Sequence, residues 1–115
     1  MALKGSCHCG RIAYSVEGEP KQVLDCNCSH CRRKGYLLWF QPRGKLTLTT
    51  PETAMQAYTF NKHVIQHQFC PSCGCAPFGF GKDKEGNAVV AINVRCLPDV
   101  DLTKVKITPA DGARY

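Results

Sequence analysis

Nine of the 115 residues are cysteine, and eight of them lie in three short clusters. The clusters are Cys7-His8-Cys9, Cys26-Asn27-Cys28-Ser29-His30-Cys31 and Cys70-Pro71-Ser72-Cys73-Gly74-Cys75. Thiols one or two residues apart can converge on one ion, whereas a disulfide needs alpha carbons about 4.4–6.8 Å apart and suitably directed side chains. Zinc binds such thiolates tetrahedrally at about 2.3 Å. The cysteine pattern therefore predicts metal binding before any other property.

The length of the chain predicts a single domain that spans residues 1–115. The first residues contain no apolar stretch of the kind found in signal peptides, and the longest apolar runs, residues 36–40 and 88–92, are too short for a membrane span. We therefore expect a soluble cytoplasmic protein. Thiols stay reduced in that compartment, where clustered cysteines favour metal over disulfides.

The formal net charge of +6 raises the question of nucleic-acid binding. Seven thiolates and two zinc ions would lower that charge to +3, because they add seven negative and four positive charges. The longest basic run is Arg32-Arg33-Lys34, which is shorter than the blocks typical of nucleic-acid-binding tails. We therefore do not expect nucleic acid as a partner.

Turn-forming residues recur at short intervals and separate short segments with strand character. The predicted strands are residues 12–16, 36–40, 46–49, 55–60, 64–69 and 88–95. Residues 61–63 predict a hairpin turn, and the apolar run at 88–95 predicts a central strand. Helix is expected only at residues 29–35, as one turn, and at residues 101–105. The pattern predicts a mainly β domain of small sheets, held together where the cysteine clusters meet.

The third cluster begins with Cys70-Pro71-Ser72-Cys73-Gly74, which has the form of a zinc knuckle. Proline sets φ in the turn, and glycine can adopt the positive φ that turns backbone N–H groups toward thiolates. One knuckle supplies only two ligands, and an extended Cys7-His8-Cys9 segment would place its two sulfurs on one face. Cys7, Cys9, Cys70 and Cys73 are therefore predicted to form a closed structural zinc site.

The middle cluster places three thiols, Cys26, Cys28 and Cys31, directly before the basic residues Arg32 and Arg33. Three protein ligands and an open position are typical of a reactive zinc site. Neighbouring basic residues would lower the thiol pKa values and attract an anionic ligand. The alternative is a second closed structural site. From the residues alone, the two interpretations are nearly equal, and the fourth ligand of a closed site would be His30, His63, His67, Cys75 or Cys96.

The remaining candidates have simpler interpretations. Cys75 and Cys96 are expected to be buried thiols without a chemical role. His63 and His67 are expected to be packed or surface side chains. Three aromatic residues that follow the middle cluster are core candidates by default and pocket-wall candidates by position; they are Tyr36, Trp39 and Phe40.

The ordered motifs C-H-C-G, C-x-C-S-x-C-R-R, F-C-P-x-C-G and I-N-V-R-C-L resemble those of the glutathione-dependent formaldehyde-activating family, which includes the centromere protein V domain. The resemblance runs from Gly5 to Gly112. It implies a β-tent-like fold of small antiparallel sheets around zinc. It also implies that the first and third clusters hold a structural zinc, and that the middle cluster holds a second, reactive zinc, so that two zinc ions bind per chain. The three-ligand site would hold its metal less securely.

The resemblance further implies an enzyme of the carbon–sulfur lyase type that condenses glutathione with formaldehyde to S-(hydroxymethyl)glutathione. Cys26, Cys28 and Cys31 would then be catalytic as zinc ligands, and Arg32 and Arg33 would bind the carboxylates of glutathione. Water or His30 would supply the proton that completes the adduct.

Two other functions compete with this hypothesis. A non-catalytic zinc module would bind protein or nucleic acid through a closed second site. A redox-responsive protein would oxidise Cys26, Cys28 and Cys31 and release metal. We rank the thiol-handling enzyme first, because the three-thiol cluster lies beside a basic run. The sequence makes no prediction of the oligomeric state.

Overall fold

The computed structural model describes residues 2–60 and 65–111, which form two β-sheets and one short α-helix. The smaller sheet has three antiparallel strands in the order β1-β2-β5. These strands are β1 (Ala2–Ser6), β2 (Ala13–Glu17) and β5 (Leu46–Leu48). The alternation of apolar residues in β2 buries Tyr14 and Val16 on one face, as the period of two predicts.

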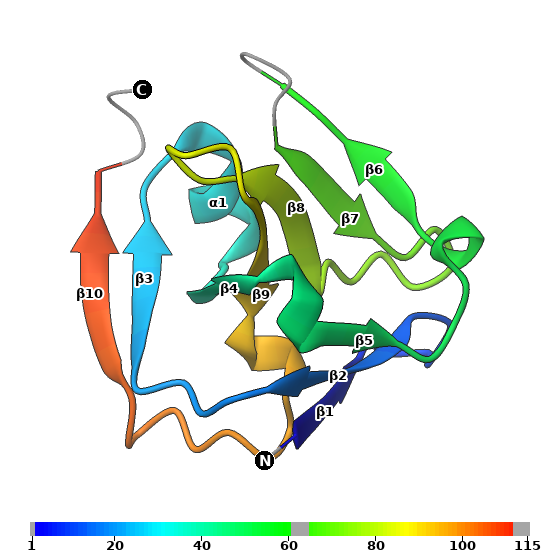
Figure 1. Ribbon diagram of the computed structural model, residues 1–115, viewed down its shortest axis with the longest axis horizontal. Helices are drawn as coiled ribbons and strands as arrows, with labels where there is room; N and C mark the ends of the chain where they lie inside the picture. Colours follow the sequence, from blue (N-terminus) through cyan, green and yellow to red (C-terminus); the bar gives the residue numbers. More distant parts are fainter. Residues whose placement is uncertain (1, 61–64, 112–115) are drawn as a thin grey trace.

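The larger sheet has seven strands and connects segments from most of the chain. In spatial order they are β10 (Lys106–Ala110), β3 (Gln22–Cys26), β4 (Leu38–Pro42), β9 (Ala88–Asn93), β8 (Phe78–Lys82), β7 (Gln66–Phe69) and β6 (Gln56–Tyr58). Neighbouring strands are antiparallel except for β10 and β3, which run in parallel at one edge (Figure 1). The prediction of a mainly β domain is confirmed, although β1, β3, β8 and β10 were not predicted as strands and the parallel pair was not expected.

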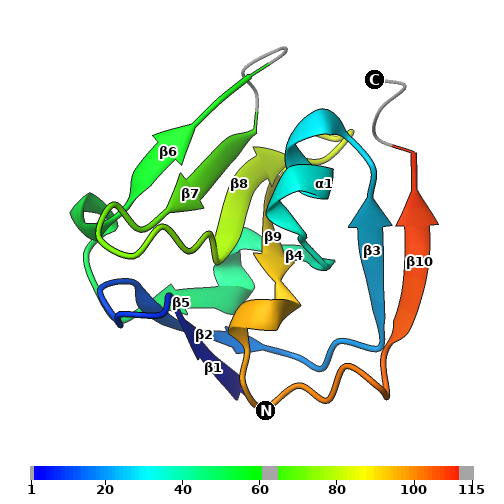
Figure 2. The ribbon, with the colours of Figure 1, turned by 180° about the vertical axis from the view of Figure 1, so that it is seen from behind.

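The two sheets enclose the main hydrophobic core. In both views the three-stranded sheet lies in the lower part of the molecule, and α1 (Ser29–Lys34) lies in the upper part between β3 and β8 (Figures 1 and 2). Ile12, Val16, Val23 and Val90 have no exposed surface. Ile92 in β9 lies opposite Trp39 in β4 and opposite Phe78 in β8, so the prediction of a central strand at this position is confirmed.

The predicted helical turn at residues 29–35 is confirmed as α1. It begins after Cys28, whose side chain accepts the N–H of Cys31, and it ends at Gly35 with φ of 73°. The helix predicted at residues 101–105 is wrong. Asp101 instead accepts both the N–H and the hydroxyl of Thr103, at 3.0 and 2.6 Å, and this local bonding favours a turn over a helix.

The predicted hairpin is confirmed by the antiparallel pairing of β6 with β7, in which Tyr58 lies opposite His67. Its predicted turn at residues 61–63 lies outside the described residues. None of the helices among the described residues has the length and apolar composition needed to cross a bilayer.

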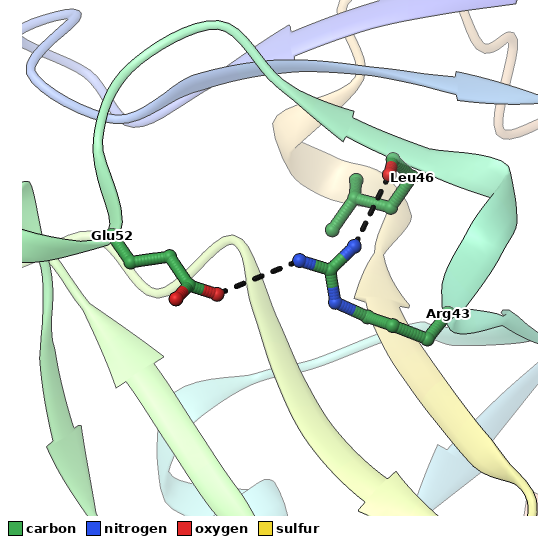
Figure 3. A network of polar contacts seen from close by, with 3 residues as sticks. All are labelled: Arg43, Leu46 and Glu52. Carbon is green, nitrogen blue, oxygen red and sulfur yellow. Dashed lines mark hydrogen bonds and ion pairs between the residues drawn. The ribbon is translucent and has the colours of Figure 1, made fainter.

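Three 3-10 turns complete the described structure: η1 (Arg43–Lys45), η2 (Glu52–Ala54) and η3 (Val94–Cys96). Arg43, in η1, connects this turn to η2, because its guanidinium lies 3.5 Å from Glu52. The same guanidinium also donates to the carbonyl of Leu46 at 3.1 Å (Figure 3). The same guanidinium lies 4.8 Å from the ring centroid of Phe80. This partly exposed network fixes the segment between β4 and β6.

Candidate metal centres and their pocket

The first cysteine cluster consists of Cys7, Cys9, Cys70 and Cys73, whose sulfur atoms all lie within 4.8 Å of one another. The Sγ atom of Cys9 lies 3.8 Å from that of Cys7 and 3.6 Å from that of Cys70. Sulfur ligands about 2.3 Å from one tetrahedral centre would be about 3.8 Å apart. The cluster therefore has the spacing of a tetrathiolate site, and it joins the segment after β1 to the segment after β7.

Backbone N–H groups surround the sulfurs of this four-cysteine cluster. Cys7 accepts the N–H of Ile12 at 3.3 Å, and Cys70 accepts those of Ser72 and Cys73 at 3.4 Å. The N–H of Cys75 and that of Cys9 lower the pKa of Cys73 to about 5. Hydrogen bonds of this kind favour thiolates, the form that binds a metal.

The second cluster consists of Cys26, Cys28 and Cys31, whose sulfur atoms also lie within 4.8 Å of one another. Cys26 ends β3, Cys28 caps α1, and Cys31 lies buried inside the helix. The 3.2 Å bond from the N–H of Cys31 to the sulfur of Cys28 belongs to the helix cap. The local fold of residues 26–31 is therefore sufficient to bring the three thiols together.

The thiols of this three-cysteine cluster differ in acidity. Burial opposes ionisation of Cys28, but the N–H groups of Cys31 and His30 lower its pKa. Burial, a hydrogen bond to Cys28 and the charges of Cys28 and Cys26 raise the pKa of Cys31. Three thiolates this close repel one another, so a divalent cation is needed to hold all three in the ionised form. The donor set fits a metal such as zinc.

Among residues 2–60 and 65–111, no fourth Cys, His, Asp or Glu ligand atom joins the three-cysteine cluster. The alternatives His30, His67, Cys75 and Cys96 do not group with it there, and His63 lies outside the described residues. The described structure thus presents one group of four potential ligands and one group of three.

Residues that pack against the three-cysteine cluster line a pocket of about 320 Å³, although none of the three cysteines lines it. The connection runs through His30, which lies in α1 between Cys28 and Cys31, and through Tyr36, which packs with Cys31. The residues that line the pocket are His30, Lys34, Tyr36, Tyr58, His67, Gln68 and Phe69. The pocket lies where α1 meets the β6–β7 hairpin.

The pocket has an aromatic wall. The ring centroid of His30 lies 4.3 Å from that of His67 and 5.4 Å from that of Tyr58. Burial lowers the pKa of His30, as does the charge of Lys34, and burial together with His30 lowers the pKa of His67 to about 4. Both imidazoles are therefore neutral near pH 7. The Nδ1 atom of His30 is buried and has no hydrogen-bond partner in the described part of the chain.

Comparison with known proteins agrees with these features. Residues 2–110 match the family described as glutathione-dependent formaldehyde-activating enzyme. The chain belongs to this family. It is also similar to a Rhodobacter sphaeroides protein of known crystal structure, a structural genomics target, with 27% identity and a TM-score of 0.77. That alignment covers 92% of this chain and 100% of the other chain.

Membership of the glutathione-dependent formaldehyde-activating family confirms the resemblance predicted from the cysteine motifs. It supports glutathione as the thiol partner and formaldehyde as the carbonyl compound. Both cysteine clusters can hold metal, as zinc sites in this family would require.

The two residues predicted to bind substrate lie outside the wall of the pocket. Arg32 and Arg33 are exposed, and neither lines the pocket; Arg33 donates to the carbonyl of Ser29 at 2.8 Å. Lys34 lines the pocket instead. The role of Arg32 and Arg33 in substrate binding stays a prediction.

Of the three aromatic candidates, only Tyr36 lines the pocket, while Trp39 is buried in the main core and Phe40 is half exposed. Cys75 and Cys96 are partly buried, and Cys96 lies 3.8 Å from the side-chain nitrogen of Asn93.

Besides His30 and Tyr36, the sequence predicted no role in the pocket for the five other lining residues, which are Lys34, Tyr58, His67, Gln68 and Phe69. Two signals were present. His30 and Lys34 are spaced by one helical turn, which places them on one face. Tyr58 and His67 are opposite each other in the predicted hairpin.

Proposed function

We propose that the protein is a zinc enzyme of the carbon–sulfur lyase type that joins glutathione, or a related small thiol, to formaldehyde or another small aldehyde. The supporting observation is the three-cysteine cluster beside a pocket, with no fourth ligand atom in the described residues. Four protein ligands complete a structural zinc site, whereas three leave a position for a substrate.

In this proposal Cys7, Cys9, Cys70 and Cys73 hold a structural zinc, and the three-cysteine cluster holds a reactive one. Zinc, when bound there, stabilises a substrate thiol as the thiolate at neutral pH. The N–H groups of Cys31 and His30 lower the pKa of Cys28 and so favour the thiolate form of this ligand.

The reaction forms one carbon–sulfur bond. The substrate thiol releases its proton to water, the electron pair of the resulting thiolate attacks the carbonyl carbon, and the carbon–oxygen π pair moves to the oxygen, which takes one proton back from water. His30 lines the pocket and lies in α1 between Cys28 and Cys31, and its neutral imidazole can donate one hydrogen bond and accept another. We assign it the passage of this proton.

Positive charge beside the cluster would orient the thiol substrate. Arg32 and Arg33 are exposed on α1, where Arg33 also donates to the carbonyl of Ser29, and both can pair with carboxylates. Holding the thiolate and the carbonyl compound together replaces a bimolecular encounter with an oriented one.

Glutathione binding and product formation test this function. We would load the protein with zinc, follow binding by calorimetry and follow S-(hydroxymethyl)glutathione formation by exchange NMR. Cys28→Ser should lose both, and Cys96→Ala, which removes a thiol outside the two clusters, should retain both. A wild-type protein with two zinc ions that binds neither glutathione nor any other small thiol would overturn the proposal and favour a non-catalytic zinc module.

A further inference from the structure

The pocket beside the three-cysteine cluster is much larger than a one-carbon aldehyde. Its volume is about 320 Å³. One water occupies about 30 Å³ of liquid, and formaldehyde has only two non-hydrogen atoms, whereas a cavity of about 150 Å³ accepts benzene. The pocket therefore has room for an aromatic ring and its substituents.

The chemistry of the wall suits a planar apolar group. Tyr36, Tyr58 and Phe69 line it together with the rings of His30 and His67. The ring of Tyr58 is half exposed, and it stacks on His30 with an interplanar angle of 29°. A bound ring would cover the exposed part of Tyr58 and gain both apolar burial and ring stacking.

Among the described residues that line the pocket, one side chain carries a positive charge near pH 7. Lys34 is the cationic lining residue, and its Nζ atom lies 6.0 Å from the ring centroid of Phe69. His67 adds no charge near pH 7, because burial and the neighbouring His30 lower its pKa to about 4. A single exposed ammonium beside an aromatic wall complements a ring that carries one anionic substituent.

Glutathione itself is a poor match for this wall. The tripeptide carries two carboxylates, an ammonium and two amides, and polar groups buried without partners are costly. The described lining offers one cation, Lys34, for the two carboxylates and no carboxylate for the ammonium. The carbonyl compound is therefore the better occupant, with the thiol approaching from the cluster.

We propose that this pocket binds the aromatic ring of an aldehyde that bears a carboxylate, so that the carbonyl compound handled beside the three-cysteine cluster is a carboxylated aromatic aldehyde. The inference rests on the proposed function for the formation of the carbon–sulfur bond. An aromatic aldehyde would add the thiol by the same steps as formaldehyde, with the same atoms and electrons balanced. The occupancy of the pocket, however, can be tested without the reaction.

The test uses 4-carboxybenzyl alcohol, which has the ring and the carboxylate but no aldehyde, and benzyl alcohol as its neutral partner. Binding is followed by NMR chemical shifts of the zinc-loaded protein. We expect saturable binding of the acid with a Kd of about 1 mM or tighter. Tyr58→Ala should weaken it about fivefold through lost stacking and burial. Lys34→Met should weaken the acid about threefold and leave benzyl alcohol unchanged.

Phe40→Ala provides the matched control, because Phe40 is an exposed aromatic residue that does not line the pocket. Its affinity for both alcohols should equal that of the wild type. Absence of saturable binding by the wild type, or equal affinities in Tyr58→Ala and the wild type, would overturn the inference. Formaldehyde turnover by the same wild-type preparation tests the proposed function separately, since neither alcohol can react.

Discussion

The two cysteine clusters should contribute unequally to stability, because they close chain loops of different length. Cys9 and Cys70, whose sulfurs are 3.6 Å apart, are separated by 61 positions. A cross-link across that separation removes about 4 kcal/mol of chain entropy from the unfolded state, whereas one across the five positions from Cys26 to Cys31 removes about 2 kcal/mol. The first value is a large part of the stability of an ordinary domain.

Each perturbation removes two thiols from one cluster. Cys7→Ala/Cys9→Ala frees the amino-terminal segment from the knuckle, and Cys26→Ala/Cys28→Ala leaves a single thiol in the second cluster. At about 4 °C per kcal/mol for a chain of this size, the first variant should unfold about 8 °C below the second. Circular dichroism during heating, with zinc at stoichiometric concentration, measures this difference.

Two controls isolate the contribution of the metal. Cys96→Ala removes a partly buried thiol outside both clusters, so its loss of stability should be the same with zinc and with excess chelator. The gap between the two double variants should close in chelator. A first variant that does not fold, beside a second that does, agrees with the reasoning. Equal losses in the two double variants with zinc present would refute it.

Two further predictions concern the core and the pocket. Ile92→Ala should lower the free energy of unfolding in urea by about 2–5 kcal/mol, because the side chain is fully buried between β4 and β8. Ile107→Ala, at 47% exposure on β10, should change it by about 0.5 kcal/mol or less, and equal effects would contradict the assigned core. For His67, the folded pKa of about 4 lies below the unfolded value of about 6.5, so the unfolded state binds more protons between these values and stability should fall as pH falls from 6.5 to 4. Urea titrations across this range should show a shallower decline in His67→Gln, and an unchanged slope would contradict the burial of a neutral imidazole. The titratable groups that face His67 across the pocket are His30, Lys34, Tyr36 and Tyr58.

The sequence predicted those parts of the molecule that depend on local spacing. The residues 26–31 approach one another within one strand end and one helical turn, so their pattern alone was informative. The alternation in β2 and β5 and the apolar run in β9 were likewise sufficient to identify strands.

Parts that depend on distant pairing were not predictable in the same way. β10 contains Pro109, is largely exposed and exists as a strand through its parallel pairing with β3. Local sequence carries little information about such an edge. The pocket forms only where the β6–β7 hairpin meets α1, so no single segment indicated it. Lys34 was predicted only as part of a basic run with Arg32 and Arg33. In α1 it lies one helical turn after His30, so both of these side chains line the pocket while the two arginines do not.

We infer that the zinc-loaded protein has one closed cluster and one cluster with an open position. X-ray absorption at the zinc edge measures this most directly in the zinc-loaded protein. Four ligands at one site and three at the other predict an average of 3.5 sulfurs per zinc, with a light oxygen or nitrogen ligand at about 2.0–2.1 Å. Added glutathione should raise the average to four and remove the light ligand. Four sulfurs per zinc before glutathione is added, or a light ligand that persists at saturating glutathione, would contradict an open position at the three-cysteine cluster.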